Sequence, residues 1–361
     1  MRKFTNAEQG FKGIDVFVGL DVHKSSWKVT IRSMGLEIET YSTNPSPEGL
    51  AQHLETNYAG GIFHSAYEAG FCGFWIHAAL VKRQINNMVI HAADVPTTNK
   101  EKVTKTDKID SRKIAKCLEN GSLNPLYVPS IDEQQLRSLV RLRSRMMSHQ
   151  TRLKNRIKGH LHFYGIELGD ERAAQYWSGA FIAELETLAE APNAAGTYMR
   201  LCLNELKDQR CRLAEITREL RLSCRNPAYA DTMHYLLSVP GVGFVTAVTL
   251  LTELLDIDRF KGLDELCAYV GMVPSEHSSG DKTRRGGLSP RKNRHLKHLI
   301  IESAWVAMRR DPELTQAFAR LTTRMKKTDA VIRICKKLLN RIRYVWKNQT
   351  PYQIHASSQV A

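Results

Sequence analysis

Two aspartates lie three residues apart in a strongly basic segment of the chain. The segment KVTKTDKIDSRKIAKCL, residues 102–118, contains six lysines and arginines, and its only acids are Asp107 and Asp110. In a helix, residues three apart share a face, so the two carboxylates would point the same way. Adjacent carboxylates repel each other. Either the surrounding lysines or a hard divalent cation such as Mg²⁺, which prefers oxygen ligands, could offset that repulsion.

Two further acids stand at the ends of apolar stretches. Asp21 ends the run IDVFVGLD, and Glu68 ends the run IFHSAYE. Such runs are typical of buried strands, and a charge at the end of one lies at the rim of a sheet. Strand-end acids and a helical acid pair are the layout of an RNase H-like nuclease, in which carboxylates hold two metal ions at a phosphodiester. We therefore predict a metal site made of Asp21, Glu68, Asp107 and Asp110, with the nearby lysines holding the phosphate backbone.

The elements that must position these acids belong to residues 1–128. Apolar and alternating patterns predict strands at 14–21, 27–31, 36–41, 62–68 and 87–91, and helices at 46–55, at 73–83 and from 106 into 117. Ser46 and Pro47 supply the N-cap and the first position of the first helix. Three strands followed by alternating helices and strands predict a mixed α/β sheet.

Residues 129–225 have a helical pattern instead. Apolar residues recur at helical spacing in a first run (Leu139, Leu142, Met146, Leu153 and Ile157) and every seven residues in a second (Leu206, Leu213 and Leu220). The stretch EAPNAAG, residues 190–196, separates the two runs. This pattern predicts two long helices in an antiparallel, coiled-coil-like hairpin.

The first of these helices is basic. It carries eight lysines and arginines between residues 137 and 158, and its two nearby acids are Asp132 and Glu133. A charged helix face is often merely solvated, but so large an excess favours contact with nucleic acid. The candidate phosphate-binding residues on it are Arg137, Arg141, Arg145, Arg152 and Arg156.

Residues 226–361 form a third, mostly helical region. Gly241 and Gly243 separate two apolar helices, as in a helix-hairpin-helix turn whose backbone N–H groups hold a phosphate. An ordinary tight turn between helices would give the same pattern. The stretch 274–295 is polar, basic and rich in glycine, which predicts a mobile loop, and a basic amphipathic helix follows near the C-terminus.

The composition favours a polyanionic partner. The 361 residues include 52 lysines and arginines against 37 acids, a formal net charge of +15, and nucleic acid is the commonest partner of such a chain. No apolar run is long enough to span a membrane, and the N-terminus lacks the apolar region of a signal peptide. The seven cysteines form no C-x-x-C pair, which predicts reduced thiols in a cytoplasmic protein.

Several motifs follow one another in a fixed order. They are GLDVHKSSWKVTI, YEAGFCGFWIHAAL, KTDKIDSRKIAKCL and SVPGVGFVTAVTLLTE, the last followed by FKGLDELCAYVGMVPSEHSSG. In order and spacing they resemble the transposases of the insertion sequence 110 family, the bridge-RNA-guided recombinases. The resemblance covers nearly the whole chain. It implies a RuvC-like domain of the RNase H fold, with Mg²⁺ as cofactor and a D-E-D-D tetrad at Asp21, Glu68, Asp107 and Asp110.

The resemblance also implies a C-terminal transposase domain with a catalytic serine. The family motif P-x-x-x-x-S-G matches Pro274–Gly280, which assigns the nucleophile to Ser279 and leaves Ser278 as the alternative. A serine hydroxyl can attack a phosphodiester and conserve its bond energy in a covalent phosphoserine. The candidate phosphate clamps nearby are Arg284, Arg285 and Arg291.

Family membership further implies a structured guide RNA that pairs with donor and target DNA, and a homo-oligomer, either a dimer or a tetramer. One departure from the family is the sequence LSPRKNRHL, in which Pro290 and Lys292 stand where lysine and glycine are expected. Two alternatives remain. A RuvC-like junction endonuclease would need the acids without Ser279, and a non-catalytic RNA- or DNA-binding protein would need only the basic surfaces.

Overall fold

The computed structural model describes residues 10–92, 95, 107–167, 175–279, 282–288 and 292–354, and only the backbone of 107–110, 275–279 and 282–288. Within these residues the chain forms two compact units, which meet in the sequence between Val128 and Pro129.

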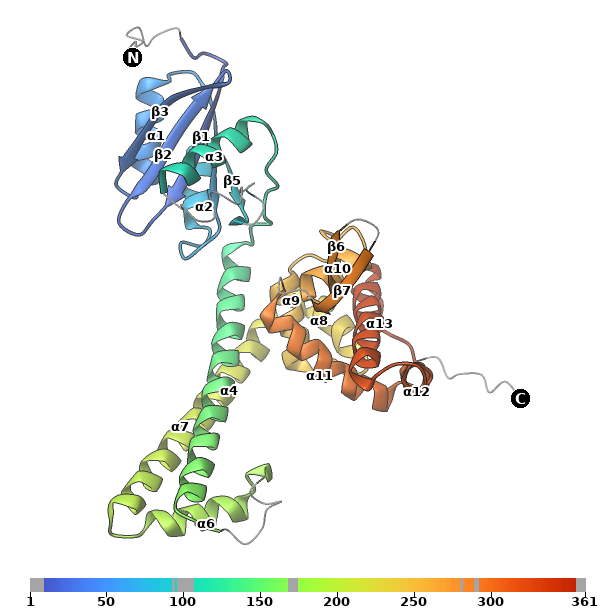
Figure 1. Cartoon of the computed structure of the whole chain (residues 1–361). Coiled ribbons are helices and arrows are strands. Elements are labelled where there is room, and N and C mark those ends of the chain that lie inside the picture. The colour runs from blue at the N-terminus through green and yellow to red at the C-terminus, as the bar shows by residue number, and fades with distance from the viewer. Residues whose placement is uncertain are drawn as a thin grey trace, which may run out of the picture. The chain divides into compact units, whose positions relative to one another are not determined.

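The first unit is built around a five-stranded mixed sheet (Figure 1). Its elements are β1 (Asp15–Val22), β2 (Trp27–Ser33), β3 (Leu36–Thr43), α1 (Pro47–Asn57), β4 (Ile62–Glu68), α2 (Trp75–Val81), β5 (Asn86–Ile90) and α3 (Asp107–Glu119). The strand order is β3-β2-β1-β4-β5. The pairs β1–β2 and β2–β3 are antiparallel, whereas β1–β4 and β4–β5 are parallel. The predicted mixed sheet is confirmed, and every predicted strand and helix of this region is present.

Helices cover both faces of this sheet. Leu50 and Leu54 of α1 and Ile76 and Leu80 of α2 pack with alternate residues of the strands on one face. On the other face, α3 packs through apolar residues that include Ile114. As predicted, Ser46 caps α1, because its side chain accepts a hydrogen bond from the N–H of Gly49 (3.0 Å) and Pro47 is the first helical residue.

The second unit begins with a long helical hairpin. It consists of α4 (Ile131–Phe163), α6 (Gly179–Ala189) and α7 (Ala194–Ser223). Ser130 and Glu133 form a capping box at the start of α4. The helices α4 and α7 are antiparallel, since Ile157 packs in a cluster with Leu206 at one end while Leu136 packs in a cluster with Leu220 at the other. The predicted hairpin is therefore confirmed.

The contact between α4 and α7 differs from the predicted apolar seam. Leu142 was expected inside it, but its side chain is 41% exposed. The buried side of α4 instead includes Gln150, and Arg143 donates a hydrogen bond to Thr217 across the hairpin (3.0 Å). The prediction of a continuous apolar seam failed because polar residues occupy the seam positions near the middle of the hairpin. Polar seam residues fix the register of paired helices at some cost in stability.

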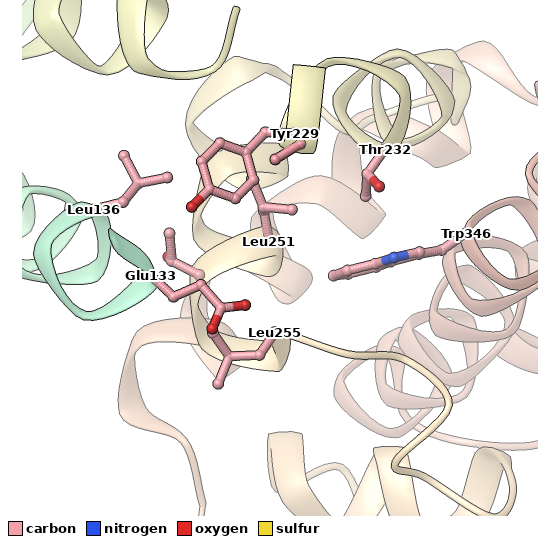
Figure 2. Close-up of a pocket in the computed structure, with 9 residues that line it drawn as sticks. Glu133, Leu136, Tyr229, Thr232, Leu251, Leu255 and Trp346 are labelled. Carbon is pink, nitrogen blue, oxygen red and sulfur yellow. The ribbon is translucent and has the colours of Figure 1, made fainter. Parts of the chain in front are cut away.

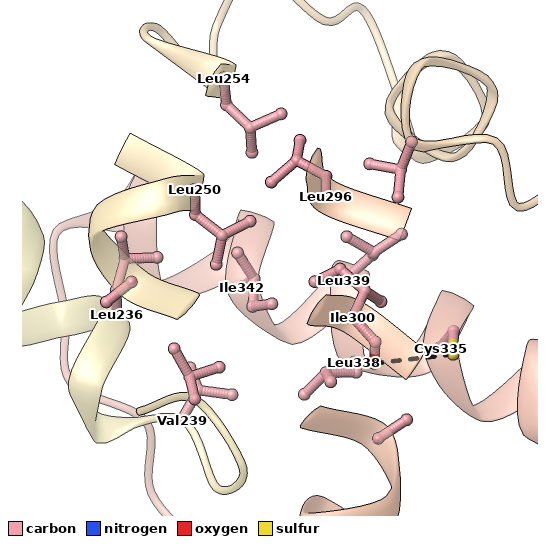
Figure 3. Close-up of a cluster of buried hydrophobic side chains, with 14 of the residues drawn as sticks. Leu236, Val239, Leu250, Leu254, Leu296, Ile300, Cys335, Leu338, Leu339 and Ile342 are labelled. Atoms are coloured by element: carbon pink, nitrogen blue, oxygen red, sulfur yellow. Dashed lines mark hydrogen bonds between the residues drawn. The ribbon is translucent and has the colours of Figure 1, made fainter. Parts of the chain in front are cut away.

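The rest of the second unit is mainly helical. Its elements are α8 (Pro227–Ser238), α9 (Phe244–Leu254), α10 (Leu263–Val270), β6 (Pro274–Ser279), β7 (Lys282–Leu288), α11 (Arg294–Arg310), α12 (Pro312–Thr322) and α13 (Lys327–Asn348). Side chains such as Leu250, Ile300 and Leu338 form one core (Figure 3). Leu136 of α4 and Leu220 of α7 belong to the same core, so the hairpin is anchored in it. The boundary predicted at residue 225 remains a prediction.

None of the helices in the described part of the chain is long and apolar enough to cross a membrane.

Candidate functional site

Two of the predicted acids lie side by side at one edge of the sheet. In the parallel pair of β1 and β4, Leu20 is opposite Tyr67, so Asp21 and Glu68 are next in line at the carboxyl ends of these strands. Residues opposite each other on adjacent strands are about 5 Å apart and project to the same face. The Asp21 side chain is 18% exposed, and its Oδ2 lies 3.2 Å from Nε2 of His23 in the β1–β2 turn.

The helix α3 lies directly on β1 because Gly19 has no side chain. A Cβ atom at Gly19 would stand 2.1 Å from the carbonyl oxygen of Ser111 and 2.4 Å from the backbone nitrogen of Ala115. The Ser111 hydroxyl, fully buried, hydrogen-bonds the hydroxyl of Thr30 on β2 (3.0 Å). These contacts fix the position of α3 along the sheet.

The helix runs against the direction of β1. Ser111 lies over Gly19, and Glu119 at the far end of α3 accepts a hydrogen bond from Arg32 (2.7 Å), whose neighbour on β1 is Phe17. The first turn of α3 therefore faces the carboxyl end of β1.

The backbone of Asp107 and Asp110 belongs to that first turn. Asp107 precedes Ser111 by four residues, a helical rise of about 6 Å. Asp21 follows Gly19 by two residues, about 6.6 Å along a strand. The two displacements match, so the start of α3 is level with the strand-end acids. The side chains of Asp107 and Asp110 lie outside the described residues.

The residue types at this edge fit a hard divalent cation, which prefers carboxylate oxygens. Among the side chains that the structure describes, no group of three or more His, Cys, Asp and Glu residues is arranged to hold a metal ion. Only Asp21 and Glu68 of the proposed ligands belong to that set.

The predicted serine lies on a β-hairpin. The predicted loop is wrong for residues 274–279 and 282–288, where β6 and β7 pair in antiparallel fashion. Main-chain pairing needs no apolar alternation, and the polar residues here gave no strand signal. Ser279 is the last residue of β6 and is opposite Lys282, while Ser278 is opposite Thr283.

The predicted phosphate clamps share this segment. The backbone of Arg284 is opposite His277 and that of Arg285 is opposite Glu276. Arg291 lies outside the described residues. The side chains of the serines and of the other two arginines are not described, so their roles remain predictions.

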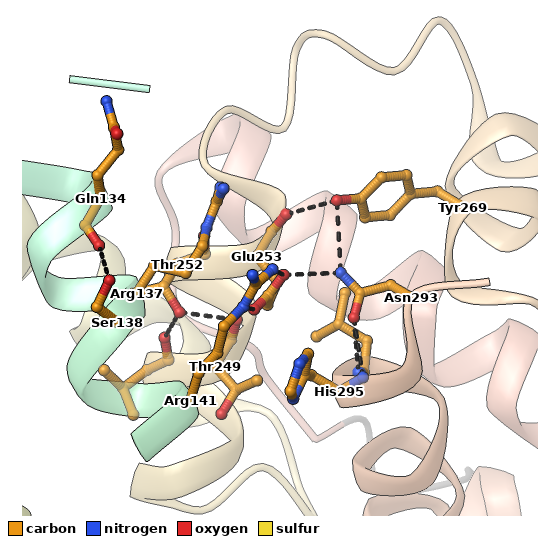
Figure 4. Close-up of polar contacts among 12 residues, drawn as sticks. Gln134, Arg137, Ser138, Arg141, Thr249, Thr252, Glu253, Tyr269, Asn293 and His295 are labelled. Atoms are coloured by element: carbon orange, nitrogen blue, oxygen red, sulfur yellow. Dashed lines mark hydrogen bonds and ion pairs between the residues drawn. The ribbon is translucent and has the colours of Figure 1, made fainter. Parts of the chain in front are cut away.

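A buried polar network lies where the chain leaves this hairpin region (Figure 4). Glu253, the penultimate residue of α9, has a side chain only 1% exposed and accepts two hydrogen bonds from Arg141 of α4 (2.7 and 2.9 Å). It also accepts one from the Asn293 amide (2.8 Å). Asn293 in turn caps α11, since its Oδ1 accepts from the N–H groups of His295 and Leu296.

The same network satisfies the carbonyls at the end of α9. Arg137 donates to the carbonyl of Thr252 (2.7 Å), and the Tyr269 hydroxyl donates to that of Glu253 (3.0 Å). The last carbonyls of a helix have no partner within it, so these contacts replace the missing ones. The sequence prediction missed Glu253, although an acid within the apolar run FVTAVTLLTEL was a visible signal.

Hydrogen bonds and nearby positive charges keep the Glu253 side chain ionised. Burial alone would raise the pKa of Glu253, but hydrogen bonds from Arg141 and Asn293 and the positive charges of Arg141 and Arg137 outweigh it, so the pKa lies below its usual value. Burial lowers the pKa of His295 nearby, which favours the neutral ring. Glu253 is therefore a carboxylate at neutral pH, paired with Arg141.

The five arginines predicted to contact nucleic acid have different surroundings. Arg137 and Arg141 donate hydrogen bonds to α9, and their contact with nucleic acid stays a prediction. Arg156 lies 3.8 Å from Glu205 in a weak, exposed ion pair. Arg145 and Arg152 are exposed seven residues apart on α4 and remain candidates.

The two helices predicted on either side of Gly241 and Gly243 are present as α8 and α9. Gly241 has a φ of +87°, and a Cβ there would stand 2.3 Å from the carbonyl oxygen of Ser303 on α11. Packing therefore explains Gly241 without a phosphate. Gly243 is exposed and is the N-cap of α9, and its predicted phosphate contact stays a prediction.

A small cavity lies elsewhere in the second unit (Figure 2). Its volume is about 90 Å³, and its wall includes Leu136, Tyr229, Leu251 and Trp346. The one acid in its wall is Glu133, whose carboxylate already accepts the Ser130 N–H of the capping box (2.8 Å). This cavity offers little room and no uncommitted acid for chemistry.

Known proteins similar to this chain point to one class. A family model of the IS110 DEDD type, described as "Transposase", matches residues 18–166, and a second, described as "Transposase IS116/IS110/IS902 family", matches residues 233–319. The first match contains all four predicted acids and the second contains Ser279. Both models describe transposases, the class that also fits a basic chain with acids gathered at a sheet edge.

Individual relatives agree with the family models. A Sinorhizobium fredii protein named as transposase y4rJ is 26% identical over 90% of both chains. The transposase of insertion sequence element IS1111A from Coxiella burnetii is 27% identical over 66% of this chain and 65% of its own length. The transposase of IS1328 from Yersinia enterocolitica is 28% identical over 58% of this chain and 60% of its own length. The chain belongs to the IS110 family of transposases.

Proposed function

We propose that this protein is the transposase of an insertion sequence, which cuts and rejoins DNA with a carboxylate metal site in the first unit and Ser279 in the second. The observation that carries the proposal is the convergence of distant acids at one sheet edge. Asp21 and Glu68 end adjacent parallel strands, and the first turn of α3, with Asp107 and Asp110, is level with them. Family membership supports the same assignment.

The fold supports a RuvC-like, RNase H-type assignment for the first unit. An antiparallel β1-β2-β3 meander continued by parallel β4 and β5, with α3 across the face, is the arrangement expected of that fold. Ligands of open sheets with parallel strands commonly bind at the carboxyl ends of those strands.

The four carboxylates would hold Mg²⁺ at this edge. When bound, a divalent metal supplies activation of the attacking hydroxyl and stabilisation of the leaving oxygen. The chain's own groups would do the rest. Carboxylates fix the geometry of the site, and the lysines at 102, 105 and 108 neutralise the phosphates of the incoming strand.

Ser279 would attack the scissile phosphorus through its Oγ. The new bond is a phosphoserine ester, the broken bond joins phosphorus to a deoxyribose oxygen, and the hydroxyl proton ends on that departing oxygen. Reversal of this step by a second DNA end rejoins the strand. From the family resemblance we further propose that a structured guide RNA selects donor and target DNA and that the protein is oligomeric. The net charge of +15 suits nucleic-acid partners.

The carboxylate site is tested by strand cleavage. Asp21→Asn removes a charge and leaves the size of the side chain unchanged, so we expect cleavage of labelled DNA with Mg²⁺ to fall at least about 100-fold while DNA affinity stays similar. The matched control is Asp15→Asn at the other end of β1, where the carboxylate is exposed and hydrogen-bonds His64 (2.8 Å). Cleavage by Asp21→Asn at the rate of the control would exclude this site from the mechanism.

A further inference from the structure

Two aromatic rings are exposed beside the carboxylate edge. The loop that follows Glu68 has the sequence AGFCGFW and leads into α2. Phe71 is 70% exposed and Trp75 is 54% exposed. Phe74, between them, packs against the core of the unit, as does Cys72. The loop therefore alternates anchoring residues with residues that face solvent.

Hydrogen bonds hold this loop to the sheet. The buried Tyr67 hydroxyl donates to the carbonyl of Gly73 (3.1 Å) and accepts from the N–H of His77 at the start of α2 (3.3 Å). The N–H of Ala69 donates to the carbonyl of Ile90 on β5 (2.8 Å). Burial raises the pKa of Tyr67, so its hydroxyl remains a donor. These hydrogen bonds fix the backbone that carries Phe71 and Trp75.

The same edge of the sheet also carries acidic and basic residues. Because β1 and β4 are adjacent and parallel, the β1–β2 turn reaches the same edge, and it carries the exposed His23 and Lys24. The strand-end acids lie between the turn and the loop. A protein partner would normally bury a continuous apolar patch. Exposed aromatic rings at an edge that also carries basic side chains are instead typical of a surface that binds single-stranded nucleic acid.

We propose that Phe71 and Trp75 are stacking platforms for unpaired nucleobases of the strand whose phosphodiester is held at the carboxylate edge, on the side of the loop after β4. This inference rests on the proposed function and adds how the strand is held there. Every base has a flat aromatic face, so such a platform tolerates any sequence. It also requires that the strand be unpaired at the site, because bases within a duplex are already stacked on their neighbours.

The test measures the affinity of the full-length protein for labelled oligonucleotides without divalent metal, so that no strand is cut. The probes are a single-stranded DNA of mixed sequence, the same strand with abasic residues, the corresponding RNA strand and the DNA duplex. We expect Phe71→Ala and Trp75→Ala each to weaken single-strand binding roughly 5- to 100-fold. Binding of the abasic strand and of the duplex should be unchanged, and Phe71→Tyr and Trp75→Phe should retain most of the affinity.

The control variant is Leu36→Ala. Leu36 is 69% exposed at the β2–β3 turn, at the opposite edge of the same sheet, and its loss should leave every affinity unchanged. A loss of affinity for the DNA strand at least as large as for the RNA strand supports the proposal. A loss confined to the RNA strand would place the rings on RNA and overturn the proposal that they hold the substrate strand.

Two further results would overturn the proposal. In the first, the alanine variants bind the abasic and the base-containing strands with the same loss. In the second, they bind all probes like the unchanged protein but differ from it in oligomeric state, which would make the rings a contact between copies. Failure of the proposed function can be distinguished from failure of this inference, because it would appear as normal DNA cleavage by Asp21→Asn.

Discussion

Glu253 carries its negative charge at the C-terminal end of α9, where the helix dipole disfavours it. The side chain is almost completely buried, so its carboxylate depends on the two hydrogen bonds from Arg141 and the one from Asn293. Removal of one partner from a buried ion pair leaves an uncompensated charge, which costs about 3–5 kcal/mol. The network joins α4, α9 and the start of α11, so its loss would loosen the region where the serine hairpin ends.

The first prediction concerns this carboxylate. Glu253→Gln should lower the free energy of unfolding at neutral pH by about 3 kcal/mol, the lower end of the range because Arg141 is partly exposed. The pKa of Glu253 is lowered in the folded state, so its contribution is complete above the unfolded value of about 4.3 and is lost as the pH falls through the folded pKa. The difference between the two proteins should therefore shrink in acid.

Denaturant unfolding at a series of pH values measures this difference. Glu302→Gln, which changes an exposed carboxylate on α11, provides the control and should have almost no effect at any pH. A difference between Glu253→Gln and the unchanged protein that stays constant from neutral pH into acid would mean that ionisation of Glu253 does not stabilise the fold.

At the scale of elements, the position of α3 on the sheet depends on one missing side chain. Gly19→Ala would drive a Cβ into the backbone of α3 at Ser111 and Ala115. We expect this change to destabilise the first unit by about 1–3 kcal/mol and to reduce DNA cleavage as well, because the first turn of α3 must shift.

A glycine-to-alanine change within α4 should instead increase the stability of the protein. Gly159 lies within α4, and a Cβ there meets nothing within 4 Å. Gly159→Ala should therefore stabilise the protein by about 0.5–1 kcal/mol. Thermal unfolding of both variants checks the pair of predictions. An unfolding temperature for Gly19→Ala at or above that of the unchanged protein would show that α3 does not depend on this close approach.

The elements themselves were largely predictable from the sequence, because periodicity and capping residues are local signals. Strand β4 was predicted with its exact bounds, and the Ser46 cap of α1 was predicted with its residue. Contacts between distant elements were not predictable. Nothing in the sequence showed that α3 would pack directly on Gly19 or that Arg141 would pair with Glu253. The pairing of β6 with β7 through polar residues gave no sequence signal either.

For the candidate site the sequence supplied residue types and strand ends but no geometry. Asp21 and Glu68 were recognisable because each ends an apolar run, and their adjacency required the parallel pairing of β1 with β4. Ser279 had no physical signal at all, since serines in polar segments are usually inert. It was predicted only through the resemblance to the family.

At the scale of the whole molecule, the charge of +15 predicts binding dominated by phosphate contacts. Arg145 and Arg152 are exposed on one face of α4 and are free of the α9 contacts that engage Arg137 and Arg141. Arg145→Ala with Arg152→Ala should reduce the slope of log affinity against log salt by about 2 for duplex DNA.

The matched control for this change is Arg320→Ala with Arg324→Ala, which removes the same charge from exposed positions at and just beyond the end of α12. Affinity measured at several salt concentrations compares the two double variants. Equal slopes would mean that only net charge matters and that α4 has no particular role in binding.

The central claim is that the protein joins DNA through Ser279 as well as cutting it at the carboxylate site. The most direct measurement incubates the protein and the proposed guide RNA with labelled DNA and Mg²⁺, denatures the mixture, and looks for label that migrates with the protein. We predict a covalent band that Ser279→Ala loses and Ser278→Ala keeps, and that Asp21→Asn also loses. If Ser279→Ala still cleaves DNA at the normal rate and none of the proteins gives a covalent band, the serine has no covalent role, and the protein would be a metal-dependent nuclease of the RuvC type.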